Sequence, residues 1–318
     1  MTVFDQVIAF LYAAILAGVP LLFGTLGEII TQKVGNINLG VEGMMYMGAI
    51  MGFLGAQIFQ NMFLAIIFAF LAGAFGALIY AFLTVTLKAN QNVTGLTLTI
   101  FGTGFANFIG ENLKGAGMVT IAPEVLKTVT PMQFGALTDI PVLGKLLFNH
   151  SIITYAGIVV AIIVGVYLNK TRYGLNMRAI GENPAAADAM GINITKYKYC
   201  NIIFGGGLCG IGGAYISLVT CVGNWQPNII GGQGWICVAL VIFASWKPYR
   251  AILGSFIFGA LSVLRFYVPS SLIPIPSAFY LMLPFVVTCI VLIVSSIKMN
   301  RENQQPAACG VNYFREER

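Results

Sequence analysis

The stretch "FLAIIFAFLAGAFGALIYAFLTVT", residues 63–86, contains no charged side chain. A run of about 18 or more apolar residues is long enough to cross the hydrocarbon core of a bilayer as a helix. Similar runs recur along the chain, which is 58% apolar and only 9% charged. Soluble domains contain about 25% charged residues. We therefore predict an all-α membrane protein rather than a soluble core.

Nine apolar runs are predicted to form a polytopic bundle of about nine or ten spans once interrupted helices are counted. They are residues 7–30, 36–57, 63–86, 93–111, 151–169, 199–222, 235–250, 251–268 and 277–297. We expect residues 1–298 to form one transmembrane domain and residues 299–318 a cytoplasmic tail. The first run follows Asp5 and has no basic segment before it, so we expect an uncleaved span rather than a signal peptide.

The basic residues predict the orientation. Thirteen fall in one set of alternating loops and four in the other. The first set is Lys33, Lys88, Lys170, Arg172, Arg178, Lys196, Lys198, Lys247, Arg250, Lys298, Arg301, Arg315 and Arg318, and the second is Lys114, Lys127, Lys145 and Arg265. The positive-inside rule places the first set in the cytoplasm. The N-terminus is then outside and the C-terminus inside, residues 170–198 form the largest internal loop and residues 112–149 the largest external one. The scattered charge does not indicate nucleic-acid binding.

The internal segment includes "RAIGENPAAADAMGI", residues 178–192. Asn183 and Pro184 are typical of a helix start, and Gly191 is placed to end the helix in a left-handed conformation. The preceding "GLNMRAIG" predicts another short helix that ends at Gly181. We expect Ala185, Ala186 and Ala187 to expose backbone to a partner. A connecting loop with incidental helicity is the alternative that the pattern leaves open.

Three separated motifs resemble one family. "YGLNMRAIGENPAAADAMGINITKYK" (173–198) closely resembles the cytoplasmic coupling segment of ATP-binding-cassette (ABC) importer permeases of the branched-chain amino acid, ribose and nucleoside type. "KVGNINLGVEGMMYMGA" (33–49) and "QPNIIGGQGWICVALVIFASWKPYRAILGSFIFGAL" (226–261) resemble its other signatures. The tail "GVNYFREER" is similar to the nucleoside and simple-sugar branch. "IFASWKPYR" is bulkier than the Gly-rich turn usual in ribose permeases, which speaks against ribose.

This resemblance implies a permease subunit with no catalytic or metal site and no cofactor of its own. ATP and Mg²⁺ would be bound by a separate ABC ATPase, and the sequence contains no G-x-x-x-x-G-K-[ST] phosphate loop. The other implied partners are a homologous second permease, in a homodimer or heterodimer, and an external substrate-binding lipoprotein. The residues implied to contact the ATPase are Arg178, Gly181, Glu182, Asn183, Pro184, Ala185, Ala186, Ala187, Asp188 and Gly191.

Two irregular segments, one in each half of the chain, predict interrupted helices beside a substrate path. One is residues 35–40, and the other is residues 224–228 with 231–234. For the second, an ordinary external loop is the alternative. Two acids, Glu28 and Glu42, lie in apolar runs, where a carboxylate must face protein or water. Each either lines the path or bonds a neighbouring helix end.

Amides, hydroxyls and aromatic rings are suited to a neutral, hydroxylated solute. The predicted path residues are Asn36, Asn38, Glu42, Asn92, Thr94, Asn107, Trp225, Gln226 and Gln233. We expect an ATP-driven importer of nucleosides in the plasma (inner) membrane. The alternatives are the same machine for simple sugars and a secondary transporter driven by H⁺ or Na⁺. The latter usually places ionisable residues near mid-membrane, and this chain has few.

Three further patterns predict structure rather than chemistry. The glycines of 205–210 match G-x-G-x-x-G but lie in a span, so we expect close helix packing, as for Gly48 and Gly52. The six cysteines form no C-x-x-C pair, and we expect them to be free thiols. His150 has no metal-ligand neighbour in the sequence and is expected on the surface at the end of a span.

Overall fold

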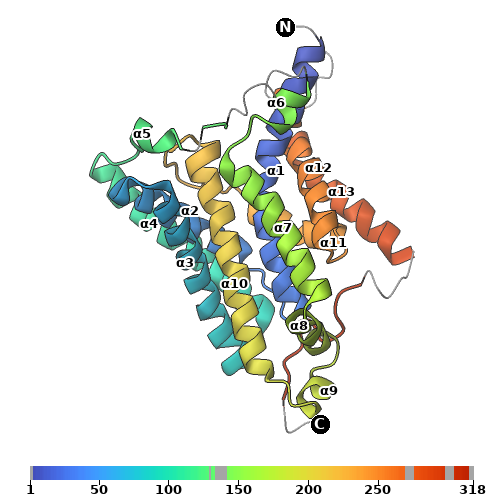
Figure 1. Ribbon diagram of the computed structural model, residues 1–318. Coiled ribbons are helices and arrows are strands. Elements are labelled where there is room, and N and C mark those ends of the chain that lie inside the picture. Colours follow the sequence, from blue (N-terminus) through green and yellow to red (C-terminus); the bar gives the residue numbers. More distant parts are fainter. Residues whose placement is uncertain (1–2, 129, 133–141, 269–275, 298–303, 315–318) are drawn as a thin grey trace.

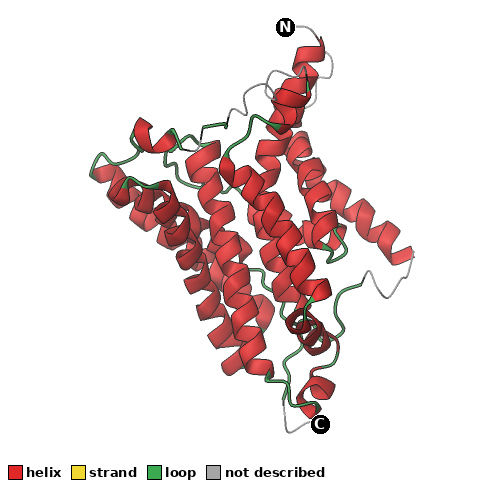
Figure 2. Ribbon diagram, viewed as in Figure 1, coloured by secondary structure: helices red, strands yellow, loops and turns green. Residues whose placement is uncertain are grey.

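The computed structural model describes residues 3–128, 130–132, 142–268, 276–297 and 304–314. Within these residues the fold is all-helical, and Figure 2 shows helices joined by loops. One isolated bridge between Thr120 and Asn224 is the only strand-like pairing in the described part of the chain. The predicted all-α class is therefore confirmed.

Long helices form the body of the molecule (Figure 1). They are α1 (Val3–Lys33), α2 (Val41–Phe59), α3 (Met62–Ala81), α4 (Gln91–Gly115), α7 (Ile152–Lys170), α10 (Ile194–Tyr215), α12 (Pro248–Val263) and α13 (Ser277–Ile297). The shorter elements are α5 (Pro123–Leu126), α6 (Leu143–Leu147), α8 (Arg172–Glu182), α9 (Pro184–Ala189), α11 (Gln233–Phe243) and the 3₁₀ turn η4 (Leu264–Phe266). The π-helical segments η1 (Phe82–Thr86) and η3 (Ile216–Thr220) extend α3 and α10.

Six of these helices are long and apolar enough to cross a membrane among the residues described. They are α1, α3 with η1, α4, α7, α10 with η3, and α12 with η4. The predicted span 235–250 is not one helix. Its polypeptide turns at Ser245 and Trp246, both at positive φ, and thereby separates α11 from α12. With 11 residues, α11 is only about 16 Å long, too short to cross a bilayer.

The two ends of the bundle carry different segments. The N-terminus lies with α5 and α6 at one end, while α8, α9 and the C-terminal tail lie at the other (Figure 1). The loop predicted to be external and the segment predicted to be internal are thus at opposite ends, as the distribution of basic residues requires.

Glycine contacts bring α10 against its neighbours without intervening side chains. A Cβ atom on Gly210 would lie 2.3 Å from the carbonyl oxygen of Ala69, and one on Gly48 would lie 2.2 Å from Gly210 Cα. A Cβ on Gly73 would lie 2.3 Å from the carbonyl oxygen of Gly206. The prediction of close helix packing through 205–210 and Gly48 is confirmed.

Other helix pairs are packed in the same way. A Cβ on Gly27 of α1 would lie 2.3 Å from the carbonyl oxygen of Gly205 in α10. A Cβ on Gly102 of α4 would lie 2.3 Å from the carbonyl oxygen of Gly43 in α2. A Cβ on Gly259 of α12 would lie 2.6 Å from the backbone nitrogen of Gly18 in α1. These helices are therefore in backbone contact.

The prediction for His150 is wrong. The residue is 2% exposed, and its Nε2 atom lies 2.8 Å from the carbonyl oxygen of Leu146. Its ring stacks on Tyr12 with centroids 4.8 Å apart. It is buried because α6 and the start of α7 fold back against α1, a long-range contact that sequence spacing does not encode. All six cysteines are free thiols, as expected.

Candidate coupling surface and polar core

The internal segment begins and ends as its sequence predicts. The hydroxyl of Thr171 accepts a hydrogen bond from the Gly174 N–H at 3.0 Å and caps α8, which ends one residue beyond Gly181. The side chain of Asn183 accepts one from the Ala186 N–H at 3.0 Å, with Pro184 in the first turn of α9. Gly191 has a φ of +78°, the left-handed conformation that terminates a helix. Both predicted short helices are confirmed.

One face of α9 points away from the bundle. Asn183, Ala186 and Gly191 are exposed, and Met190 is 81% exposed. Ala187 faces the opposite way and is only 3% exposed, so it offers no backbone to a partner, contrary to expectation. Met190 was not singled out from the sequence, although an apolar residue next to a terminating glycine was the available signal.

The tail packs against this segment. The Tyr313 hydroxyl donates to Asp188 Oδ2 at 2.9 Å, and the Ala308 N–H donates to the Gly181 carbonyl at 2.9 Å. The Ala307 N–H lies 3.4 Å from Glu182 Oε2. Within the tail, burial raises the pKa of the Cys309 thiol to about 12. Residues 304–314 therefore pack against α8 and α9.

The same tail reaches the first interrupted segment. The Gly310 N–H lies 3.4 Å from the Gly35 carbonyl. The Asn312 side chain donates to the Lys88 carbonyl at 2.6 Å and accepts from the Gln91 side chain at 3.3 Å. Gln91 also accepts from the Ile37 N–H at 2.8 Å. The tail thus connects α9 to the backbone of residues 35–40.

A cavity lies between α8, the end of α1 and the start of α12. It measures 420 Å³, and its lining includes Lys33, Arg178, Glu182 and Trp246. The buried Nε atom of Arg178 has no hydrogen-bond partner in the described structure. Gly181 is buried with its Cα against the end of α1, because a Cβ there would lie 2.3 Å from the Lys33 carbonyl oxygen. Arg178 and Gly181 therefore face the bundle rather than the outer surface of α9.

The first interrupted segment lies beside α1 in a buried polar cluster. The Asn38 N–H and the Gln32 side chain both donate to Glu28 Oε1, at 3.1 Å and 2.7 Å. The Trp246 indole donates to Gln32 Oε1 at 2.6 Å. Glu28 lies five residues before the end of α1. Because Asn38 bonds to it, residues 35–38 run back beside α1 by about 7 Å before α2 begins. Sequence reasoning missed Gln32 and Trp246, although the i, i+4 spacing of Glu28 and Gln32 was visible.

Glu42 joins the two interrupted segments. Its carboxylate accepts hydrogen bonds from the N–H groups of Gly232 at 2.8 Å and Gly234 at 2.6 Å. These groups belong to the start of α11, whose terminal amides need acceptors. Glu42 as a whole is 5% exposed. Glu42 therefore caps a helix from the other half of the chain.

The remaining residues predicted for the path are spread along the bundle. Asn36 and Asn38 are each 1% exposed, beside Glu42 in sequence. The hydroxyl of Thr94, 8% exposed, donates to the Asn90 carbonyl of its own helix. Along α4, Asn92 is exposed near the start and Asn107 is half-buried further on. Trp225 lies against Gly110, near the end of α4, and Gln226 is exposed beside it in sequence. Gln233 is the first residue of α11. Asn36 and Asn38 belong to the first interrupted segment, Trp225, Gln226 and Gln233 belong to the second, and Glu42 joins the two, whereas Asn92, Thr94 and Asn107 lie along α4.

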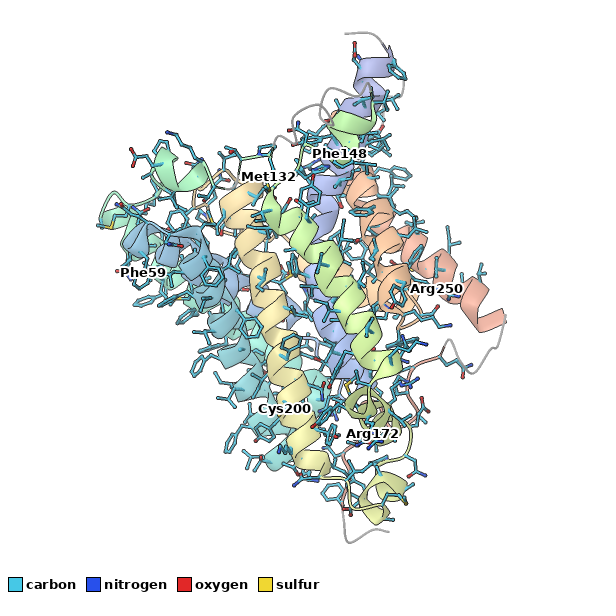
Figure 3. The ribbon with its side chains drawn as sticks, viewed as in Figure 1. Phe59, Met132, Phe148, Arg172, Cys200 and Arg250 are labelled. Carbon is cyan, nitrogen blue, oxygen red and sulfur yellow. The ribbon has the colours of Figure 1, made fainter. Side chains whose placement is uncertain are left out.

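The exposed face of α4 carries both polar and apolar side chains. Thr97, Gly104 and Glu111 are exposed on it, and a Cβ on Gly104 would meet nothing within 4 Å. Ile100, at 75%, and Phe108, at 71%, are exposed on the same helix. The exposed large residues of α7 are also apolar, such as Val159 and Ile163. Figure 3 shows the side chains along the bundle surface, with Cys200 on α10 and Arg172 on α8 labelled.

A model of the family described as "Branched-chain amino acid transport system / permease component" matches residues 10–292. The chain belongs to this permease family. Six helices among the residues that the structure describes are long and apolar enough to cross a membrane, and the chain is a multi-pass inner-membrane protein. No solved structure shows significant similarity to the chain.

Several relatives are similar over most of their length. The nucleoside ABC transporter permease NupC of Lactococcus lactis is 36% identical over 307 residues, covering 93% of each chain. The guanosine ABC transporter permease NupQ of Bacillus subtilis is 33% identical, over 88% of this chain and 89% of its own. TsgC13 of Haloferax volcanii, a permease provisionally named for glucose, is 36% identical over 80% of this chain and 76% of its own.

Proposed function

We propose that this permease imports nucleosides as a subunit of an ATP-driven ABC importer. The observation that carries the proposal is the 36% identity to a nucleoside permease across 93% of both chains. The guanosine permease of Bacillus subtilis supports the same substrate class. Membership of the ABC permease family sets aside the alternative of a secondary transporter driven by H⁺ or Na⁺.

The polar groups of the bundle suit a neutral solute. The Glu28 and Glu42 carboxylates already accept hydrogen bonds from protein groups. A charged solute would lose its hydration at this depth without a fixed partner charge, which is costly in a medium of low dielectric. A nucleoside loses less and can exchange hydrogen bonds with amides and hydroxyls. Its base can also stack on aromatic rings.

The test is competition uptake with the reconstituted complex. Radiolabelled uridine and guanosine uptake should be displaced by unlabelled nucleosides and not by ribose, leucine or nucleotides. A complex without ATP is the control for passive entry. Full displacement by ribose or leucine, with no competition by nucleosides, would show that the substrate assignment is wrong.

A simple sugar is the second candidate. It rests on the 36% identity to the glucose-named permease of Haloferax volcanii, over 80% of this chain. The same uptake assay distinguishes the two, because a sugar permease would accept glucose or ribose and ignore the base of a nucleoside.

The finer membrane arrangement is part of the proposal. We infer nine crossings, in which α2, α13, and α11 together with the irregular residues before it accompany the six long helices. The N-terminus is outside and the coupling segment is in the cytoplasm. The support is the thirteen-to-four division of basic residues and the position of α5 and α6 opposite α8 and α9 (Figure 1).

We propose that the solute moves along α4, past Asn92, Thr97 and Asn107. The support is that Asn92 and Thr97 are exposed on this helix and that the buried Oδ1 atom of Asn107 has no partner in the described structure. A second permease facing these residues would enclose the path between two subunits. Trp225 and Gln226 would lie at its outer end.

The cytoplasmic ATPase is proposed to dock on the exposed face of α9. Ala186 and Met190 lie on that face, and Asn183 holds the start of the helix. The tail can transmit a displacement of α9 into the bundle. Tyr313 is hydrogen-bonded to Asp188 of α9, and the adjacent Asn312 is hydrogen-bonded to Gln91. Gln91 in turn accepts the Ile37 N–H of the first interrupted segment. Movement of α9 would therefore reach the backbone beside Glu28. ATP and Mg²⁺ would be bound by the ATPase, and a lipoprotein would deliver solute outside.

Replacing Ala186 with Glu tests the docking surface. The variant should insert normally but lose ATP-driven uptake, because a charged side chain prevents close approach. Ala179→Glu on α8 is the matched control, an exposed alanine of the same segment outside the proposed face. Full uptake by A186E, or equal loss in both variants, would contradict the docking face.

A further inference from the structure

A polar cavity lies between the tail and the start of α10. It measures 430 Å³ and is lined by η1, the link to α4, the segment after α9 and the tail. Thr84, Lys88, Asp188, Asn193, Lys198 and Tyr313 are among its lining residues. This volume accommodates a small anion together with several waters.

Lys198 is the unusual member of this lining. Its side chain is only 6% exposed, yet no hydrogen bond or ion pair is formed by its ammonium group with the described residues. Buried lysines are nearly always paired, because an uncompensated buried charge is costly. The cavity is therefore the place where a compensating group can reach Lys198.

The other charged groups around the cavity are Lys88 and Asp188. The Lys88 ammonium donates to the Tyr313 carbonyl and lies 4.9 Å from the centre of the Phe314 ring, so no carboxylate neutralises it among these contacts. Asp188 Oδ2 accepts the Tyr313 hydroxyl at 2.9 Å. Two cations thus share the cavity with one carboxylate that is already hydrogen-bonded.

The N-terminus of α10 adds to this positive field. Asn193 caps the helix by accepting the Lys196 N–H at 2.9 Å, which leaves the earlier N–H groups of Ile194 and Thr195 at the cavity wall. The amides at the start of a long helix favour a negative group, and α10 has 22 residues. An anion placed between these amides and Lys198 would satisfy both.

We propose that this cavity binds a phosphate group, held by Lys198, Lys88 and the N-terminal amides of α10. The phosphate is either a free ion or the headgroup of an anionic phospholipid. The second source is sterically open, because Phe82 and Leu87 beside the cavity are 50% and 58% exposed and can lie against acyl chains. Bound phosphate would touch the coupling segment and the tail together.

The experiment compares the wild-type chain with Lys198→Met, which keeps the length of the side chain but removes its charge. Lys196→Met is the matched control, because Lys196 is exposed two residues away on the same helix. In detergent, inorganic phosphate is titrated at constant ionic strength and binding is followed by the shift in melting temperature. In nanodiscs, phosphatidylglycerol in phosphatidylcholine is compared with phosphatidylcholine alone, and retained lipid is counted by native mass spectrometry.

We expect K198M to weaken binding of at least one probe by about tenfold or more, because a hydrogen bond to a charged group is lost, while K196M binds as the wild type does. An effect with inorganic phosphate identifies a free-ion site, and an effect only with phosphatidylglycerol identifies a headgroup site. Lys88→Met should weaken the same probe, which keeps the test valid if K198M does not fold. Equal binding by the wild type and both cavity variants, or no binding of either probe to the wild type, overturns the proposal.

Discussion

Replacing Glu42 with Gln should destabilise the protein, because the Glu42 carboxylate accepts two N–H groups at the start of α11. Its two oxygens accept from Gly232 at 2.8 Å and from Gly234 at 2.6 Å. Gln has nearly the same shape but only one acceptor oxygen. In E42Q, an amide NH₂ group would therefore face one of the two N–H groups, which would have no acceptor.

The size of the effect follows from these contacts. A hydrogen bond to a charged group contributes about 1.5–3 kcal/mol, and a negative charge at a helix N-terminus adds roughly 0.3–1 kcal/mol. Losing one bond and the charge should therefore cost about 2–4 kcal/mol of folding free energy. For a chain of this length that corresponds to a fall in melting temperature of roughly 5 °C.

Thermal unfolding of the purified chain in detergent, followed by tryptophan fluorescence, measures this difference. Glu124→Gln is the control, because Glu124 is exposed on α5, outside the proposed path and the helix that Glu42 caps. If E42Q melts within a degree of E124Q while solute uptake falls, Glu42 acts on the solute and not as the cap that we describe.

Three further results are expected. Gly210→Ala should lower the free energy of unfolding by about 1–3 kcal/mol, because the added methyl would lie 2.3 Å from a backbone oxygen. Gly104→Ala, with nothing within 4 Å of the added methyl, should be neutral or stabilising, and equal melting temperatures of the two variants would refute this packing. With native cysteines replaced, a cysteine at Asn61 should react with an impermeant thiol reagent from outside and one at Gln305 should not, and the reverse pattern would invert the topology. The Cys309 thiol, whose pKa is raised to about 12, should stay protonated and react slowly at pH 8 and faster as the pH rises towards that value; rapid labelling at pH 8 would contradict its burial.

Local features of the fold could be predicted from the sequence because local chemistry determines them. The uncharged run 63–86 forms α3 with η1, and Asn183-Pro184 begins α9 because an amide cap and a proline suit the same short stretch. Close packing through the glycines of 205–210 could be predicted because small residues in a span let neighbouring helix backbones approach each other.

Features that depend on distant partners could not be predicted. Lys247-Pro248 indicates a turn between the seventh and eighth runs, but nothing in the sequence places the turn earlier, at Ser245 and Trp246, because both are ordinary residues at unusual backbone angles. The bond between Tyr313 and Asp188 joins residues 125 positions apart, and no local pattern marks such a pair. The helix that Glu42 caps begins 191 positions later, so the sequence left its role open between path and helix end.

The glycine contacts have a mechanical consequence. Interlocked side chains can slide by changing rotamers, but backbones that touch at Gly27 with Gly205, Gly43 with Gly102, and Gly48 with Gly210 have no rotamers to change. We expect α1, α2, α3, α4, α10 and α12 to move together as one rigid body. The alternation between outward-facing and inward-facing states would then be a rocking of this whole subunit against its neighbour, with the hinge lying between subunits.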